Sequence, residues 1–455
     1  MRFLSRQRKK RRRGQPLVDI IIVLQCLGQC LDKTMLQQLN VIVPAILAMT
    51  GRVTMLGISR WTDQGGSYRT IQRFYNSVIA WATVNWIFIR HHLLDPTDII
   101  LVGGDETVVT KSGKQTYGLD RFFSSLYGKP VPGLSFFSLS LISVKARTSY
   151  PVMMEQGLKE AAEQPAKKAA GKKDKKSARK KGRPQGSQNK NRREVELKPY
   201  LIRIQTMLKK LLSLIGIDLK LVYCVLDGAF GNNHALQMVG QCSLHLISKL
   251  RADAALYFPY AGPQKKRGAR KKYGQKVDYA RLPDKYLKET TVVDGIQTCI
   301  YQMTMWHKLF PDPLNVVIIS KINLKTQARA HVVLFSSDLE LAYDQLIDYY
   351  RLRFQIEFNF RDAKQFWGLE DFMNVNQTPV YNAVNLAIFM VNLAQVLLGH
   401  FRPTCPTFSV NDLKAYFRGR KYVTETLKLL PQRPEPIFID QIFANIAQIG
   451  SINAS

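Results

Sequence analysis

The stretch DIILVGGDETVVT, residues 98–110, begins as an apolar run rich in β-branched residues and turns acidic at Asp105. A short apolar run bounded by glycines is typical of a strand buried in a sheet. A second run, LKLVYCVLDGAF at 219–230, ends in the same way at Asp227. In α/β folds, ligands bind outside the carboxyl ends of the strands. The two carboxylates therefore predict a site at one edge of a sheet.

A third acidic candidate, Glu357, lies in YYRLRFQIEFNFRDAKQFWGLEDF, residues 349–372, which reads as one amphipathic helix. On one stripe of this helix stand residues spaced three or four apart: Tyr350, Arg353, Glu357, Arg361 and Lys364. Leu352, Ile356 and Phe358 are expected to face a core. An exposed face carrying the ion pair of Glu357 with Arg361 is the structural alternative.

The spacing Y-x2-R-x3-E-x6-K, met by Tyr350, Arg353, Glu357 and Lys364, resembles the signature of the bacterial DDE transposases of insertion-sequence family four. Asp105 in GGDET and Asp227 in LDGAFGNN resemble that family's first two acidic residues. The likeness covers most of residues 97–400. It implies an α/β fold in which an RNase H-like mixed-sheet catalytic core is interrupted by a β-rich insertion. Asp105 would then lie on the first strand, Asp227 on the fourth and Glu357 on a later helix.

The same resemblance implies a mechanism and partners. The catalytic residues Asp105, Asp227 and Glu357 would hold two Mg²⁺ ions, with Mn²⁺ as a substitute, about 3.5–4 Å apart for in-line attack on phosphodiesters. Tyr350, Arg353 and Lys364 would hold phosphates at the transposon ends. A homodimer on double-stranded DNA is expected. Trp306, in the expected insertion, is a candidate for stacking on a flipped base, with core packing as the alternative.

The N-terminal stretch GISRWTDQGGSYRTIQRFYNS, residues 57–77, has the outline of a helix-turn-helix. Gly65 and Gly66 would make the turn, and Ser67 would cap the second helix. The apolar stripe of that helix is predicted to be Tyr68, Ile71, Tyr75 and Val78. On its opposite face lie donor-rich residues suited to phosphates and base edges: Arg69, Gln72, Arg73 and Asn76. An ordinary surface helix is the alternative.

The net charge of +32 over 455 residues indicates a polyanionic partner, and nucleic acid is the first candidate. Two basic runs carry much of this charge, at 167–193 and 262–277. Within the first, KKGRPQGSQNK resembles an AT-hook that places Arg183 in a narrow minor groove; a solvated basic linker is the alternative. The six cysteines show no zinc spacing, which favours a reducing compartment.

We predict a helical N-terminal DNA-binding domain, a divided catalytic domain, an insertion and a tail. The ranges are 1–95 for the N-terminal domain, 96–239 and 331–400 for the catalytic domain, 160–198 for a basic disordered segment within it, 240–330 for the insertion and 401–455 for a helical tail. The apolar stretch 380–399 contains asparagines, so we expect a buried core helix rather than a membrane span. A bacterial cytoplasmic, nucleoid-associated location is expected.

The function predicted from the sequence is a DNA transposase that cleaves and joins DNA at the ends of an insertion sequence. Two alternatives remain open. One is a domesticated, non-catalytic DNA-binding protein that keeps the helix-turn-helix and the basic tracts. The other is a metal-dependent DNA nuclease without strand transfer, which shares the three carboxylates and differs only in an assay for joining.

Overall fold

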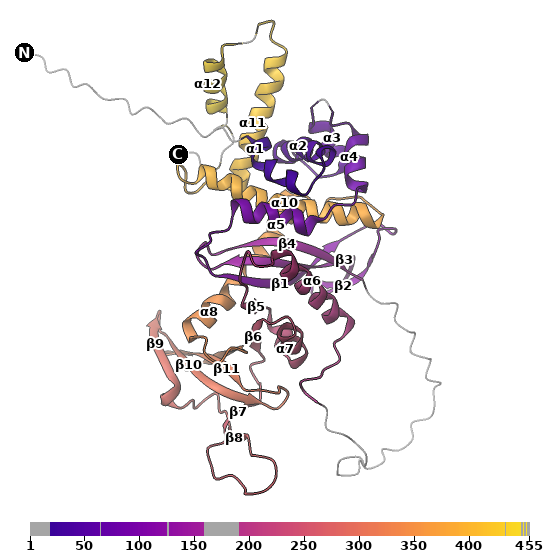
Figure 1. Cartoon of the computed structure of the whole chain (residues 1–455). Coiled ribbons are helices and arrows are strands. Elements are labelled where there is room, and N and C mark those ends of the chain that lie inside the picture. The colour runs from indigo at the N-terminus through magenta and orange to yellow at the C-terminus, as the bar shows by residue number, and fades with distance from the viewer. Residues whose placement is uncertain are drawn as a thin grey trace, which may run out of the picture. The chain divides into compact units, whose positions relative to one another are not determined.

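The computed structural model describes residues 19–63, 65–124, 127–158, 191–432 and 434–446, together with Ile449 and Ile452. The chain forms two compact units (Figure 1). A helical unit comprises Met1–Asp95 and Phe360–Ser455, and a sheet unit comprises Pro96–Asn359. The sequence-based division instead kept residues 331–400 together. Arg183 and its AT-hook-like sequence lie outside the described residues.

The sheet unit contains the strands and three complete α-helices. Its elements are β1 (Ile100–Thr110), β2 (Asp120–Ser124), β3 (Lys129–Ser143), β4 (Thr148–Gly157), α6 (Pro199–Ile215), β5 (Tyr223–Val225), η2 (Gly228–Phe230), α7 (Asn233–Gly240), β6 (His245–Leu250), β7 (Leu256–Pro259), β8 (Tyr273–Lys276), η3 (Asp284–Tyr286), β9 (Leu287–Val293), β10 (Ile296–His307), β11 (Leu314–Asn323), β12 (Arg329–Ser336) and α8 (Tyr343–Leu352). Helix α9 (Gln355–Phe366) begins in this unit and ends in the helical unit.

Five strands form the core of the sheet in the order β4–β3–β1–β5–β6. Strand β3 is antiparallel to β1 and to β4, whereas β1, β5 and β6 run parallel to one another. The carboxyl ends of β1 and β5 therefore open at the same edge. This mixed sheet is consistent with the expected RNase H-like fold, and β5 is the fourth of these five strands in chain order.

The predicted β-rich insertion, residues 240–330, continues the same sheet. Strand β6 pairs with β5 on one side and with β12 on the other, and β12 leads on to β11 and β10. Strands β9 and β7 both pair with β10, and β8 pairs with β7 (Figure 1). The insertion therefore shares one continuous hydrogen-bonded sheet with the catalytic strands.

Two glycines let the chain pack tightly on both faces of β1 next to Asp105. A Cβ atom on Gly103 would lie 2.6 Å from Ile142 Cδ1 and 2.9 Å from Ile356 Cδ1. A Cβ atom on Gly104 would lie 2.6 Å from Phe137 Cζ, on the other face. Glycine is required at both positions because neighbouring side chains occupy the space of a Cβ atom. Ile356 can therefore bring α9 onto β1.

The stretch 349–372 forms two helices, so the prediction of one continuous helix was wrong. Helix α8 ends at Leu352 and α9 begins at Gln355. Between them the backbone bonds are of the i to i−3 type, for example Ile356 N to Arg353 O at 3.0 Å and Glu357 N to Phe354 O at 3.1 Å. These tighter turns change the angular spacing of the side chains. Leu352 and Ile356 are buried as predicted, but Phe358 is 37% exposed.

The helical unit is built from helices distant in sequence. Its elements are α1 (Ile20–Leu24), η1 (Gln25–Gln29), α2 (Lys33–Ala48), α3 (Met55–Trp61), α4 (Tyr68–Asn76), α5 (Trp81–His92), α10 (Gln377–Phe401), α11 (Val410–Lys428) and α12 (Pro436–Ile446). Helix α10 is long and apolar enough to cross a membrane, yet 83% of the residues in its most apolar stretch are buried within the protein. Trp81 Nε1 donates to Asn382 Oδ1 at 2.8 Å, so a buried asparagine joins α10 to α5.

Helices α3 and α4 occupy the predicted helix-turn-helix stretch. The Ser67 side chain accepts a hydrogen bond from Thr70 N, as expected for a helix cap. Two of the four residues of the predicted apolar stripe are exposed, Tyr68 at 41% and Val78 at 89%. Val78 lies outside the helix because α4 ends at Asn76. Phe74 is buried in their place, beside Ile71 and Tyr75.

The packing around β1 predicts an asymmetric effect of two glycine substitutions. Gly104→Val should destabilise the protein by about 1–3 kcal/mol, because the new side chain collides with Phe137. Gly240→Ala, at the end of α7 with no atom within 4 Å of the new Cβ, should change stability by less than about 1 kcal/mol. Urea unfolding monitored by circular dichroism measures both. Equal midpoints for the two variants would contradict the assigned packing.

Candidate active site

Asp105 and Asp227 emerge where the pairing of β1 with β5 stops. The last paired residues are Gly103 and Val225, and each aspartate lies two residues beyond its own member of that pair. Strand β1 itself continues to Thr110 along β3. Asp105 therefore lies in the middle of its strand, at the point where the neighbouring strand has ended.

Arg353 connects Asp105 to Glu357. Its Nη1 atom lies 2.7 Å from Asp105 Oδ2, and its Nη2 atom lies 3.1 Å from Glu357 Oε1. The side chains of Arg353 and Asp105 are only 15% and 21% exposed, so this ion pair is shielded from water. The tight turns between α8 and α9 place Arg353 at the end of one helix and Glu357 in the first turn of the next.

The electrostatics show that the three carboxylates are neighbours. Burial raises the pKa of Asp105, and the negative charges of Asp227 and Glu357 raise it further. Arg353 and the Glu106 N–H oppose this shift, because both stabilise the ionised form. The pKa of Asp105 nevertheless stays above its ordinary value. A carboxyl with a raised pKa beside two other carboxylates favours the arrival of a further positive charge.

Asp227 is oriented by its own turn. Its side chain accepts a hydrogen bond from Ala229 N at 3.0 Å and so caps η2. Its carbonyl oxygen accepts a bond from Ser248 Oγ at 2.6 Å. The turn from β5 into η2 is thereby fixed to β6, which holds the carboxylate at the sheet edge.

Tyr350 shares this environment, whereas Lys364 belongs to the helical unit. Burial raises the pKa of Tyr350, with further contributions from the charges of Asp227 and Asp105, while Arg353 lowers it. The phenol therefore lies near the carboxylates. Lys364 Nζ lies 3.1 Å from Glu370 Oε1. Arg353 contacts Asp105 and Glu357, and the charges of Asp105 and Asp227 act on Tyr350.

Glu106, adjacent to Asp105 in sequence, faces the other side of β1. It accepts a hydrogen bond from Ser135 Oγ of β3. Phe137, Tyr200 and Phe230 gather on that face, with ring centroids 6.2–6.3 Å apart. No sequence pattern indicated Tyr200. Phe230 was indicated by the sequence, because it is the third residue after Asp227 in LDGAFGNN, the stretch that resembles the family's second acidic motif.

The other predicted DNA-binding residues lie on α4. Arg69, Arg73 and Asn76 are exposed and Gln72 is half-buried, opposite the buried Ile71 and Phe74. Asn76 Nδ2 donates to Gln72 O at 2.7 Å, so this side-chain amide is hydrogen-bonded to the backbone of its own helix. Trp306 is half-buried, and its ring centroid lies 6.0 Å from that of Tyr273.

The chemistry of the donor set fits a divalent cation. Carboxylate oxygens are the preferred ligands of Mg²⁺ and Mn²⁺, and Asp105, Asp227 and Glu357 supply three carboxyl groups. Within the described ranges no group of three His, Cys, Asp or Glu side chains stands in metal-binding arrangement. Arg353 contacts two of the three carboxylates instead.

The class of protein follows from comparison with known families. The family model described as "DDE superfamily endonuclease" matches residues 26–310, which is more than half of the chain. The chain therefore belongs to the DDE superfamily endonucleases. Members of this superfamily depend on divalent metal ions and act on DNA. The match contains Asp105 and Asp227 and ends before Glu357. No curated protein matches the chain.

The raised pKa of Asp105 predicts how cation binding responds to pH. A cation must displace the proton from this carboxyl below its pKa, so Mn²⁺ affinity should rise by about tenfold per pH unit and level off above it. Arg353→Ala removes a positive charge that lowers the pKa, so the levelling-off should move to higher pH. Electron paramagnetic resonance of free Mn²⁺ measures this. Arg351 is an exposed neighbour, so Arg351→Ala should not change the pH at which Mn²⁺ affinity levels off. If Arg353→Ala also left this pH unchanged, the contact of Arg353 with Asp105 would be contradicted.

Proposed function

We propose that this DDE endonuclease is a transposase that cleaves DNA at the ends of an insertion sequence and joins the cut ends to a target. The observation that carries the proposal is that Asp105 and Asp227 both follow the last β1–β5 pair, while Arg353 links Asp105 to Glu357. Family membership supports cleavage of DNA. The step from cleavage to joining rests on the resemblance of the Tyr350, Arg353, Glu357 and Lys364 spacing to insertion-sequence family four.

In this proposal each carboxylate has the same principal role. Asp105, Asp227 and Glu357 would hold two Mg²⁺ ions, for which Mn²⁺ can substitute. When bound, such ions supply activation of the attacking oxygen and stabilisation of the departing one. Arg353 contributes a planar guanidinium suited to bidentate contact with a phosphate, and Tyr350 a hydroxyl donor beside it. Lys364 would contact a neighbouring phosphate after leaving Glu370.

Recognition of the ends is assigned to α4. Its exposed Arg69, Arg73 and Asn76, with Gln72, offer donors and an amide to base edges and phosphates. Arg183 would add a minor-groove contact. Because two ends have to be cut and joined together, a homodimer on double-stranded DNA is part of the proposal. The expected location is the bacterial cytoplasm, associated with the nucleoid and without a membrane.

A metal-dependent nuclease that cuts without joining is the second candidate, because it needs the same three carboxylates. A non-catalytic DNA-binding protein is the third, and the convergence of the acidic residues argues against it. The first two differ in the nucleophile of the second step: water gives cut ends only, whereas a 3′-hydroxyl gives joined products.

The first test is cleavage and strand transfer on labelled DNA that carries the element's own ends. With Mg²⁺ we expect both cut and joined products, and EDTA should abolish both. Asp227→Asn should lower the rates by at least about 10³-fold, since a metal ligand supplies several kcal/mol to the transition state. End binding by Asp227→Asn should persist. Cutting without joining supports the nuclease; binding without either reaction supports the non-catalytic protein.

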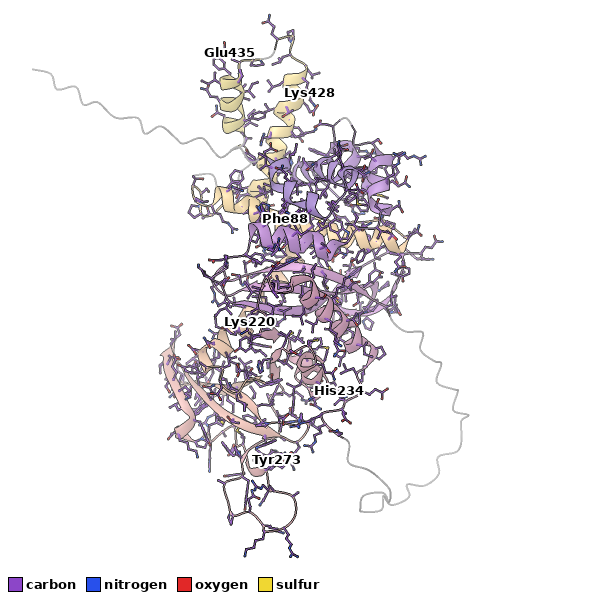
Figure 2. The ribbon with its side chains drawn as sticks, viewed as in Figure 1. Phe88, Lys220, His234, Tyr273, Lys428 and Glu435 are labelled. Atoms are coloured by element: carbon purple, nitrogen blue, oxygen red, sulfur yellow. The ribbon has the colours of Figure 1, made fainter. Side chains whose placement is uncertain are left out.

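A basic hairpin on the insertion supports DNA as the partner. Residues 254–277 contain seven Lys and Arg and no Asp or Glu. The hairpin is β7 and β8 with the loop between them, and Tyr273 stands at its base (Figure 2). There, Lys272 Nζ lies 4.9 Å from the Trp306 ring and Lys308 Nζ lies 4.8 Å from the Tyr257 ring. Six of the seven basic residues lie in the loop between the strands and one, Lys276, on β8, so the ribbon carries a basic loop of the sign that suits DNA phosphates.

The hairpin predicts a specific dependence on salt. Replacing Lys265, Lys266, Arg267 and Arg270 with Gln should reduce the slope of log affinity against log salt by up to about 0.9 per lost phosphate contact. The matched control removes four exposed lysines elsewhere on the insertion: Lys285, Lys288, Lys321 and Lys325. Fluorescence anisotropy at several salt concentrations measures both. An equal change of slope in the two variants would mean that net charge, and not the hairpin, is responsible.

A further inference from the structure

A pocket of about 630 Å³ opens on the face of the sheet opposite α9. Its walls come from the middle of β1, from β2, from the end of β4 and from the start of α6. The residues that matter here are Glu106, Phe122, Gln156, Lys198, Tyr200 and Arg203. The volume lies in the range of pockets that enclose small organic ligands. None of these residues belongs to the predicted catalytic set. We call it the Tyr200 pocket.

The Tyr200 pocket adjoins the catalytic edge. Glu106 follows Asp105 directly, and Phe230, three residues after Asp227, stacks on Tyr200 with ring centroids 6.2 Å apart and planes at 25°. The charges of Glu106, Asp227 and Asp105 all act on the Tyr200 phenol, together with its burial. The pocket is therefore close to the predicted catalytic residues, on the other face of β1.

One end of the pocket is positively charged. Arg203 Nη1 donates to Gln156 O at 3.1 Å, and its Nε is buried without a partner. Lys198 is exposed at the start of α6 and makes no side-chain cap. Pro199, the first residue of α6, has no N–H, so the backbone donors without an intrahelical acceptor at this end are those of Tyr200 and Leu201. Together these groups are suited to a phosphate.

The pocket also offers rings and a hydrogen-bond acceptor, and Arg203 Cζ lies 5.4 Å from the centroid of the Tyr200 ring. Tyr200 and Phe122 supply aromatic surface from α6 and β2. Glu106 accepts from Ser135 Oγ and keeps further acceptor capacity towards the pocket. Gln156 contributes an amide that bonds Tyr117 O at 2.9 Å. Rings for stacking beside an acceptor match the face and the edge of a nucleobase.

We propose that the Tyr200 pocket holds one nucleotide of the cleaved strand, next to the scissile phosphate. Its phosphate lies at Lys198, Arg203 and the start of α6, and its base lies between Tyr200 and Phe122 with its polar edge towards Glu106. This inference rests on the proposed function, because DNA must be the substrate. A free anion would fill only the cationic end and would leave the aromatic walls without a ligand.

The experiment uses duplexes that carry the element's own ends, with one thymine at a time replaced by 5-iodouracil. Each duplex is irradiated with the Asp227→Asn protein, which keeps the DNA uncut, and cross-linked peptides are identified by mass spectrometry. A cross-link to Tyr200 or Phe122 from a position within two nucleotides of the cut supports the proposal. Lys198→Gln should reduce its yield, whereas Lys209→Gln, an exposed lysine later on α6, should not.

A second measurement does not depend on the fold of a single variant. An abasic nucleotide at the cross-linked position should slow cleavage by the otherwise unchanged protein about 5- to 150-fold, the range expected for one lost stacking contact. The same abasic DNA should slow Tyr200→Ala no further, since the ring that the base contacts is already absent. Additive losses, or cross-links only to other parts of the chain, overturn the proposal.

Two further outcomes are separable. If inorganic phosphate binds to the pocket but no cross-link reaches Tyr200 or Phe122, the pocket binds an anion only. The proposal is then wrong. If the unmodified protein binds the DNA and cross-links at the pocket without cutting it in Mg²⁺, the proposed catalytic function fails while the pocket stands.

Discussion

The short parallel pairing of β1 with β5 is the constraint on which the candidate site depends. It stops at Gly103 and Val225, and an aspartate follows two residues later in each strand, at the same sheet edge. A longer pairing would cover the β5 side of Asp105 with backbone, whereas its other side is paired with Ser138 of β3. The two glycines before Asp105 serve the same geometry, because they let Ile356 and Phe137 pack against the two faces of the strand.

Three carboxylates at one partly buried edge repel each other, and the structure offsets this with one guanidinium. Arg353 contacts Asp105 and Glu357 at once, so a single side chain neutralises part of the charge on two elements distant in sequence. Burial still keeps the pKa of Asp105 raised. The site is therefore stable enough to fold and remains receptive to additional positive charge. The same guanidinium can serve a phosphate once cations neutralise the carboxylates.

Basic groups surround this acidic edge at several distances. The Tyr200 pocket brings Lys198 and Arg203 to the opposite face of β1, and the β7–β8 hairpin extends a ribbon with seven basic residues from the same sheet. The rings of the pocket and of the hairpin base lie beside these cations. Cations beside aromatic rings suit a polyanion that also has aromatic bases. Part of the large net charge of the chain is therefore located at these two places.

The sequence by itself determined the local features: the strands that lead to Asp105 and Asp227, the cap at Ser67 and the burial of Leu352 and Ile356. These follow from periodicity and from residue type, which act over a few neighbouring positions. Tertiary structure decided the rest. The break between α8 and α9 changes the angular positions that a single helix would give, and the exposure of Phe358, Tyr68 and Val78 depends on where helices end and what covers them. Glu357 is a local i, i+4 partner of Arg353, but Arg353 reached Asp105, and Tyr200 reached Phe230 and Phe137, only through contacts between segments far apart in the chain, which no local pattern encodes.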